Sequence, residues 1–165
     1  MAHRFTAVLF GLVLALTSCQ GQPASEEAAT DTSVTATRPA PEIRHDTEEL
    51  AATFPALGAP VSASWIAWDN SGGSESTRLS LQWIDAVVEV TPETMAGLVD
   101  RYGAEDFGHR PAVQKVLEPE LPPGPFLTGV ELNMYFGGPR RSTRAFLDPA
   151  ADTVVLQSSV AGRAP

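Results

Sequence analysis

Cysteine is almost absent from this sequence of 165 residues, in which Cys19 stands alone. A disulfide within the chain is therefore excluded, and packing of a hydrophobic core has to hold the folded part together. Thiol catalysis and cysteine-based metal sites in the folded part are excluded for the same reason. Hydrophobic residues make up 43% of the chain, which is enough for such a core.

Positive charge is scarce as well. The chain has 11 Lys and Arg residues against 20 Asp and Glu residues, and its formal net charge is −9. Because the phosphate backbone of a nucleic acid is repelled by such a surface, the sequence predicts that nucleic acid is not a partner. The three histidines form no pair with the spacing of zinc ligands, and no glycine-rich phosphate loop is present, so we expect no metal and no cofactor.

The apolar stretch near the start of the chain is too short to span a bilayer, which needs about 20 apolar residues. It covers residues 5–16 and follows Arg4, the one firm positive charge among the first residues. A short apolar core after a positive charge is typical of a secretory signal peptide. The stretch runs into LTSC at residues 16–19, which is an aliphatic residue, two small residues and a cysteine.

These four residues resemble the lipobox of bacterial lipoproteins. The resemblance covers residues 1–19 and implies that residues 1–18 are a lipoprotein signal peptide. It also implies that the Cys19 thiol receives a diacylglyceryl group and that cleavage makes Cys19 the first residue of the mature chain. Since each buried methylene contributes about 0.8 kcal/mol, two or three acyl chains anchor a protein firmly. We therefore expect a lipid-anchored protein on the extracytoplasmic face of the cell membrane.

Aromatic residues are missing from the segment that follows. Between Gln20 and His45 the only large aliphatic residues are Val34 and Ile43, and Ala, Thr, Ser, Pro and Glu dominate. Such a segment buries too little apolar surface to offset the entropy lost on ordering. Residues 19–45 are therefore predicted to be the lipidated cysteine and a flexible linker, which separates membrane and domain by about 30 Å.

From Asp46 to Pro165 the pattern is that of a single folded domain. Apolar periodicity and turn residues predict its elements in this order: a short helix over 46–54, strands over 61–68 and 79–90, a helix over 91–102, a short helix over 129–136, and strands over 143–147 and 153–157. A shift in apolar phase after Trp83 predicts a β-bulge at Trp83-Ile84. Because short turns imply antiparallel pairing, we expect an α+β fold, an antiparallel sheet of about four strands with two or three short helices on one face.

The domain is similar to small, uncharacterised lipoprotein domains of high-GC actinobacteria. The likeness lies in three short motifs: WID at 83–85, TPE at 91–93 and LPPGP at 121–125. It implies no particular activity.

All three tryptophans lie in the first predicted hairpin. Strand alternation places Trp65 on the core side with its apolar neighbours and Trp68 on the opposite face. We expect Trp65 and Trp83 to fill the core, and we single out Trp68 as a candidate residue for stacking on a sugar or a peptide.

Three arginines, Arg140, Arg141 and Arg144, follow a Gly-Gly-Pro turn. Together with Arg110 they are candidates for binding an anionic headgroup or wall polymer. The alternative is a solvated loop and strand end, where such charges keep a protein soluble.

Two further residues are candidates for acid–base chemistry. His109 lies near Glu105 and Asp106, which would suit a general base oriented by a carboxylate, but no nucleophile motif accompanies it, and a surface loop is the alternative. Asp85 interrupts an apolar strand, so it is a buried acid with a raised pKa, a residue on the solvent face, or a residue at the bulge that is bonded to backbone amides.

The sequence leaves three hypotheses for function. The first is a non-enzymatic binding module for an envelope protein or polymer, with an exposed aromatic patch near Trp68. The second is a small envelope hydrolase, in which His109 and a carboxylate converge with a hydroxyl. The third is a carrier of a lipid or small ligand, with a closed apolar cavity beneath the helices.

Overall fold

The structure is a computed structural model that describes residues 41–70 and 79–163. The predicted signal peptide, Cys19, most of the predicted linker and the tip of the first hairpin lie outside the described residues. The elements in chain order are α1 (Thr47–Thr53), η1 (Pro55–Leu57), β1 (Ser62–Asp69), β2 (Leu79–Glu89), α2 (Pro92–Tyr102), η2 (Lys115–Glu120), α3 (Val130–Phe136), β3 (Arg141–Asp148) and β4 (Thr153–Arg163), where η denotes a 3-10 helix.

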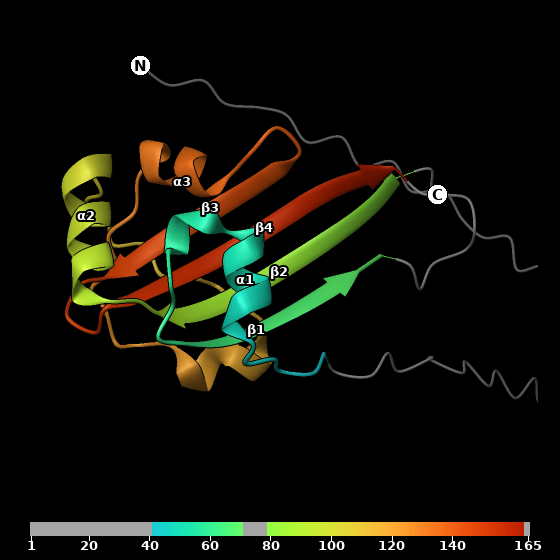
Figure 1. The fold of residues 1–165 in the computed structure, drawn as a ribbon, viewed down its shortest axis with the longest axis horizontal. Helices are drawn as coiled ribbons and strands as arrows, with labels where there is room; N and C mark the ends of the chain where they lie inside the picture. Colours follow the sequence, from blue (N-terminus) through green and yellow to red (C-terminus); the bar gives the residue numbers. More distant parts are fainter. Residues whose placement is uncertain (1–40, 71–78, 164–165) are drawn as a thin grey trace, which may run out of the picture. The chain divides into compact units, whose positions relative to one another are not determined.

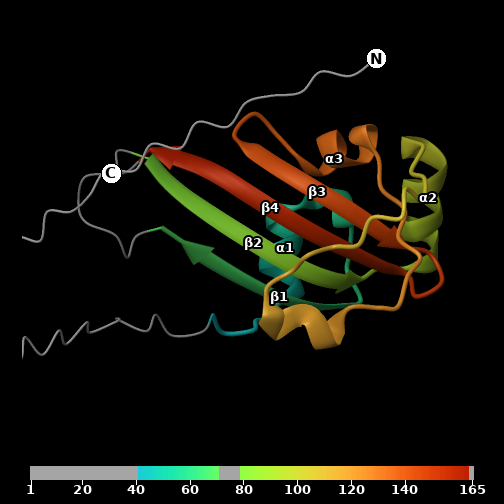
Figure 2. The same cartoon turned by 180° about the vertical axis from the view of Figure 1, so that it is seen from behind.

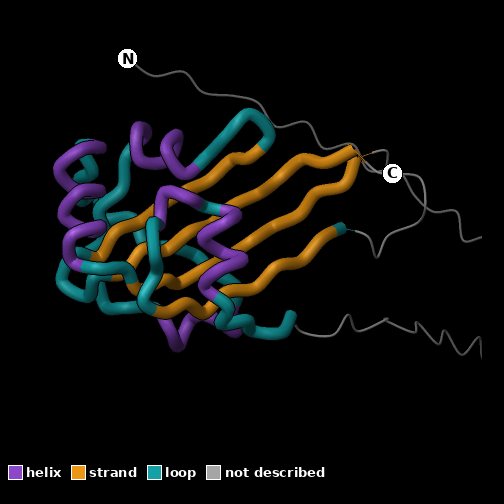
Figure 3. Tube along the Cα trace, in the orientation of Figure 1, coloured by secondary structure: helices purple, strands orange, loops and turns teal. Residues whose placement is uncertain are grey.

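The described strands form one sheet of four strands in the order β1-β2-β4-β3, and every neighbouring pair is antiparallel. Figure 1 shows α1, α2 and α3 together in front of this sheet, and Figure 3 shows the same arrangement with helices and strands distinguished by colour. The predicted α+β fold is therefore confirmed, including the sheet of four strands and the short helices gathered on one face. In this part of the chain, no helix has the length and apolarity needed to cross a bilayer.

Local signals account for the ends of α2. The Thr91 hydroxyl accepts a hydrogen bond from the backbone N–H of Thr94 at 3.2 Å, and Pro92 takes the first helical position, where its missing N–H costs nothing. Gly103 follows the helix with φ +52°, a left-handed conformation that glycine adopts without strain.

The helix α1 begins where the sequence predicts, although its capping differs from the usual pattern. Asp46 is the N-cap residue but makes no side-chain cap hydrogen bond. Its carboxylate and that of Glu49 instead bind the Arg44 guanidinium, whose centre lies 3.9 Å from the centre of the Trp65 ring. Arg44 also exchanges both backbone hydrogen bonds with Trp65. Ordered contacts thus begin before Asp46, inside the segment predicted as linker.

One face of the sheet, which we call the helical face, carries the larger core. Alternate residues of the four strands point toward α1, α2 and α3 and are buried against them. The central members are Leu50 and Phe54 of the α1 region, Met95 and Leu98 of α2, Leu132 and Phe136 of α3, and Trp65, Ala86, Val88, Ala145, Leu147, Val154 and Leu156 of the strands. Trp65 is part of this core, as predicted.

The opposite face, which we call the second face, is covered by η2 and the chain that flanks it. Figure 2 shows this segment on the side of the sheet away from α1. A smaller core forms there from Ile66, Val87, Val113, Leu117, Phe126, Phe146 and Val155. Both faces of the sheet are therefore covered, but the second one only in part.

Coverage of both faces explains why the predicted bulge is wrong. The pairing of β2 with β1 is continuous through Trp68↔Trp83 and Ala67↔Ile84. The apolar phase shifts at this point because Trp83 belongs to the second face, whereas Ile84 belongs to the helical face. Trp83 was expected in the core with Trp65, and this too is wrong. It is half-buried and lies beside Trp68.

Both edge strands of the sheet have neighbours that use their outward backbone groups. On β1, Arg44 pairs with Trp65. On β3, Leu127 exchanges both backbone hydrogen bonds with Leu147, and the Asn133 side chain accepts the N–H of Ala145. At these residues the outward backbone groups are not available to a further strand.

Candidate functional site

A groove lies on the second face, where the side chains of one sheet row change abruptly in size. From β1 to β3 this row is Trp68, Trp83, Ser159 and Ser142. Two large rings on one half of the sheet are thus followed by two small hydroxyl side chains on the other half. The step leaves a hollow of about 300 Å³ beside the rings.

The next row supplies the polar side chains of the groove. It consists of Ile66, Asp85, Gln157 and Arg144, from β1 to β3. The last three line the groove together with Ala112 and Gln114, which come from the chain before η2. The groove therefore has an aromatic wall, a floor of serines and a polar end.

The two indole rings of the wall lie nearly parallel. The ring centres of Trp68 and Trp83 are 6.1 Å apart, and the planes differ by 16°. Both side chains are half-buried, so each retains exposed ring surface. Directly opposed aromatic residues on antiparallel strands stabilise a sheet, and here they also hold one another in a fixed orientation.

The chain before η2 is tied to the floor of the groove by two hydrogen bonds. The backbone N–H of Gln114 donates to Asp85 Oδ2 at 2.8 Å, and Gln157 Nε2 donates to the carbonyl oxygen of Ala112 at 2.7 Å. These bonds fix the position of both side chains as well as that of the chain above them. The chain itself therefore holds the groove in shape.

Asp85 is a buried acid, which is one of the three alternatives from the sequence, and it accepts a backbone N–H without a bulge in the strand. Its side chain is largely removed from solvent, and burial raises the pKa of this carboxyl, although the hydrogen bond from the Gln114 N–H acts in the opposite direction. The second oxygen, Oδ1, makes no hydrogen bond to the described residues. It remains available as an acceptor at the end of the groove.

The predicted arginine cluster does not form. Arg144 lines the groove and lies over the Phe146 ring at 5.4 Å. Arg141 points to the helical face, where it donates to the Thr53 carbonyl oxygen, and Arg140 Nε donates to the carbonyl oxygen of Ala161 at 3.1 Å. The three residues separate because positions 141 and 144 fall on opposite faces of β3.

Arg110 lies apart from these three as well. Its Nη1 donates to the carbonyl oxygen of Pro123 at 2.8 Å, and its guanidinium lies 5.3 Å from the centre of the Phe126 ring. It therefore fastens two parts of the chain on the second face.

His109 is exposed and makes no hydrogen bond to a described residue, although its ring lies 6.3 Å from that of Phe107. The neighbouring Asp106 carboxylate accepts the N–H of Gly108 at 2.7 Å and closes a local turn. Among residues 41–70 and 79–163, His109 makes none of the hydrogen bonds to a carboxylate or a hydroxyl that the hydrolase hypothesis requires.

Sequence reasoning overlooked a second histidine of the folded part, His45. Its Nδ1 lies 2.9 Å from the Ala63 carbonyl oxygen and 3.3 Å from Ser64 Oγ. Because a carbonyl oxygen only accepts, the contact with Ala63 places the proton on Nδ1. A protonated Nδ1 cannot take the proton of Ser64, so this pair does not form a nucleophile with its base.

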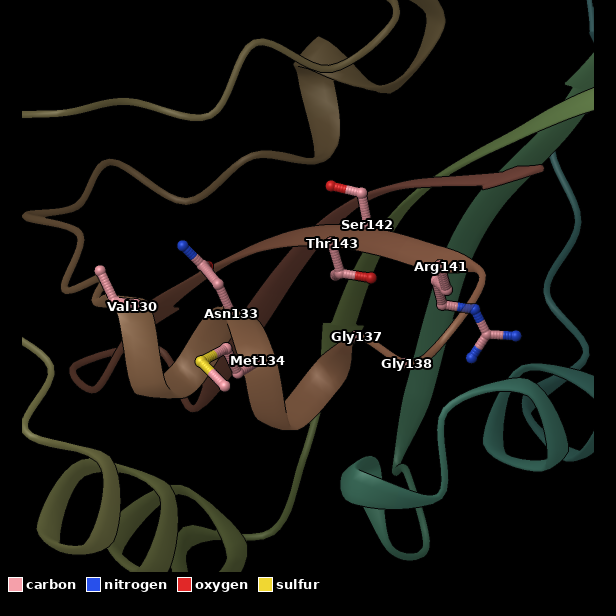
Figure 4. Close-up of a pocket in the computed structure, with 8 residues that line it drawn as sticks. All are labelled: Val130, Asn133, Met134, Gly137, Gly138, Arg141, Ser142 and Thr143. Atoms are coloured by element: carbon pink, nitrogen blue, oxygen red, sulfur yellow. The ribbon is translucent and has the colours of Figure 1, made fainter.

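A second hollow, of about 470 Å³, lies between α3 and β3. Figure 4 shows Val130, Asn133 and Met134 on the helix, with Thr143 on the strand beside it and the Arg141 side chain directed away. It is open to solvent, unlike the closed apolar cavity that the carrier hypothesis predicts. The described residues that line it include no acidic or histidine side chain, and Asn133 already accepts the Ala145 N–H.

Within residues 41–70 and 79–163, no group of three or more His, Cys, Asp and Glu side chains is placed to hold a metal ion. Of the residues singled out from the sequence, the groove brings together Trp68, Asp85 and Arg144. It adds Trp83, Gln157 and Ser159, which only the strand register could have revealed. Comparison of the chain with protein-family models, with curated proteins and with solved structures found no match.

Proposed function

We propose that the protein is an exported, lipid-anchored binding module of the cell envelope, and that the groove on the second face is its binding site. The observation that carries this proposal is the groove itself, in which two nearly parallel indole rings stand beside a guanidinium and the Asp85 carboxylate, one oxygen of which makes no hydrogen bond to a described residue. Binding sites combine apolar or aromatic walls with a few fixed polar groups in this way.

The composition of the groove favours binding over hydrolysis. Among the described lining residues Asp85 is the only carboxylate and there is no histidine, and the hydroxyls of Ser142 and Ser159 make no hydrogen bond to a described carboxylate or histidine. General acid–base catalysis needs a proton acceptor within reach of the nucleophile, and glycoside hydrolysis needs a pair of carboxylates.

The proposed anchor rests on the lipobox resemblance at residues 16–19. If Cys19 carries the lipid, the wild-type protein fractionates with membranes and the Cys19→Ala variant does not. Mass spectrometry of the N-terminal peptide from the membrane fraction identifies the acyl chains. An unmodified Cys19 in a membrane-bound wild-type protein would contradict the proposed lipid anchor, and it would not affect the proposed binding site in the groove.

The binding site is tested by photo-cross-linking in the producing cell. A photoreactive residue at Ser159, on the groove floor, should form an adduct with an envelope component. The adduct should be lost in the Trp83→Ala background and kept in the Tyr135→Ala background, where an exposed aromatic residue outside the groove is removed. The matched control is the same photoreactive residue at Ser80, on the helical face of β2. Equal adducts from both positions would argue against a site in the groove.

A further inference from the structure

We infer that the ligand of the groove is a saccharide, namely a neutral stretch of an envelope glycan that stacks on Trp83. This inference rests on the proposed function, since it names the ligand class of the same site. It is carried by the aromatic wall, by the type and placement of the polar groups, by the balance of charge and by the covered sheet edges.

The wall offers an aromatic face to the groove. Trp83 has the Trp68 ring on one side, at 6.1 Å, and the short side chain of Ser159 on the other. No large side chain of the row therefore covers Trp83 on its groove side. The face of an indole ring is electron-rich, and the axial C–H groups of a pyranose ring carry partial positive charge, so the two surfaces attract one another.

The polar groups around this wall suit hydroxyl groups, which both donate and accept hydrogen bonds. Asp85 Oδ1 is a fixed acceptor, because Oδ2 is held by the Gln114 N–H. Arg144 presents donors only, and the serine hydroxyls of the floor both donate and accept. An array of this kind lets neighbouring hydroxyls of one sugar ring donate to the carboxylate and accept from the guanidinium.

The charge of the groove is balanced, which argues against an ionic ligand. One carboxylate and one guanidinium belong to the same row of the sheet, at Asp85 and Arg144. A phosphate or carboxylate ligand would be attracted by the arginine and repelled by the aspartate, in a protein whose net charge is −9. A neutral polyhydroxylated ligand meets no such conflict.

A peptide fits the site less well. Extended peptides commonly bind by pairing with a free sheet edge, and the edges of this sheet are occupied at Trp65, Ala145 and Leu147. The groove lies on the face of the sheet, where it offers side chains rather than a ladder of backbone groups. It also has no enclosed apolar pocket for an anchoring side chain, because its apolar surface is mainly the two indole rings.

Contacts within the chain hold the side chains of the site in place. Asp85 and Gln157 are already held by the chain before η2, and the two rings support one another. Binding then orders few additional side chains, which matters for a ligand whose individual hydrogen bonds are weak.

The test is a titration of the full chain, purified in detergent, followed by tryptophan fluorescence. The probes are neutral tetrasaccharides of the chito, cello and malto series and the protease-treated carbohydrate fraction of the producing cell's envelope. At least one of these should change the fluorescence saturably. The dissociation constant should rise at least tenfold in Trp83→Ala and also in Ser159→Leu, which fills the hollow without removing a ring. Tyr135→Ala should bind as the wild type does.

The outcomes separate the ligand class from the proposed function. No saturable change with any carbohydrate probe overturns the saccharide, and so does binding that Trp83→Ala and Ser159→Leu leave unchanged while both variants keep the wild-type circular dichroism. If the photoreactive residue at Ser159 is then cross-linked to a peptide, the proposed saccharide ligand is wrong but the proposed binding function is supported. If the groove forms no adduct and binds no carbohydrate, both proposals fall.

Discussion

The two faces of the sheet are built from the same four strands, but they carry different kinds of side chain. On the helical face, aliphatic and aromatic residues from the strands meet α1, α2 and α3 and are almost fully buried. On the second face, the rows near Val87 and Val155 are covered by the chain around η2, whereas the rows of Trp68 and Asp85 stay open on one side. The larger part of the buried core therefore lies on the helical face, and on the second face the rows of Trp68 and Asp85 keep exposed surface beside the groove.

The hydrogen bonds across the second face are a further difference between the two faces. A buried carboxylate and an amide at the boundary of the covered area, Asp85 and Gln157, hold the backbone of residues 112–114. Polar groups replace aliphatic packing where the cover ends. Groups of this kind fix a chain in one position, and the aliphatic packing of the helical face contributes most of the burial.

The largest effect is expected from a truncation in the larger core. Leu156 is fully buried on the helical face, and Leu156→Ala should lower the free energy of unfolding by about 2–5 kcal/mol. Urea unfolding measures the loss, and Leu156→Met, which nearly conserves volume, should cost less than about 1.5 kcal/mol. Equal losses for the two variants would mean that packing at this position does not decide stability.

A truncation under the second face should cost less overall and act more locally. Leu117 of η2 is fully buried in the smaller core, and Leu117→Ala should cost about 2–3 kcal/mol. Hydrogen exchange should speed up at the Gln114 amide, whose partner is Asp85, before it speeds up in the helical face. Uniform loss of protection over both faces would show that they unfold as one unit, and it would contradict local unfolding of the second face.

The covered edge of β3 can be opened by a single substitution. Asn133→Ala removes the acceptor of the Ala145 N–H, and it should cost about 1–2 kcal/mol because that group is left without a partner. Asn133→Asp keeps an oxygen in this position and serves as the control. If the alanine variant is as stable as the aspartate variant, water replaces the lost bond and the edge needs no cover.

The smallest effect, and the one that depends on pH, is expected at Asp85. Burial raises the pKa of this carboxyl in the folded protein above its value in the unfolded chain. Folding is therefore favoured while Asp85 is protonated, and stability is lost as the pH rises from the unfolded pKa through the folded one. Asp85→Asn removes this loss and keeps an acceptor for Gln114, so it should be the more stable protein at neutral pH. The difference should vanish below about pH 4, and an unchanged difference there would contradict it.

Local signals in the sequence were sufficient for the elements, and non-local pairing was needed for the site. Thr91 with Pro92, and Gly103 after the helix, predict the ends of α2 because caps depend only on neighbouring residues. Alternation likewise placed Trp65 in the core. The apolar pattern of β2 requires a bulge at Trp83-Ile84 only if a single face of the strand is buried. Residues of β2 are buried on both faces, so the strand has no bulge and the predicted core position of Trp83 is wrong.

The groove itself could not be read from the sequence. Ser159 lies beside Trp83 only because β4 inserts between β2 and β3, an arrangement that joins residues far apart in the chain. Neighbouring arginines were expected to act together, but the pleat of β3 sends Arg141 and Arg144 to opposite faces. Trp68, the candidate residue for stacking on a sugar or a peptide, lines the groove, and its role in binding stays a prediction.

One pair of matched variants tests most directly whether the helical face determines stability and the second face determines binding. Trp65→Phe removes the indole N–H that donates to the Asp46 carbonyl oxygen at 3.1 Å, together with core volume, whereas Trp83→Phe alters only the groove wall. Unfolding and carbohydrate titration of both variants should show opposite losses. Trp65→Phe should lose about 2 kcal/mol of stability and keep its binding, and Trp83→Phe should keep its stability within about 1 kcal/mol and bind more weakly. If both variants lose the same stability and bind equally well, the groove is only another part of the core, and the proposed separation of stability and binding between the two faces is wrong.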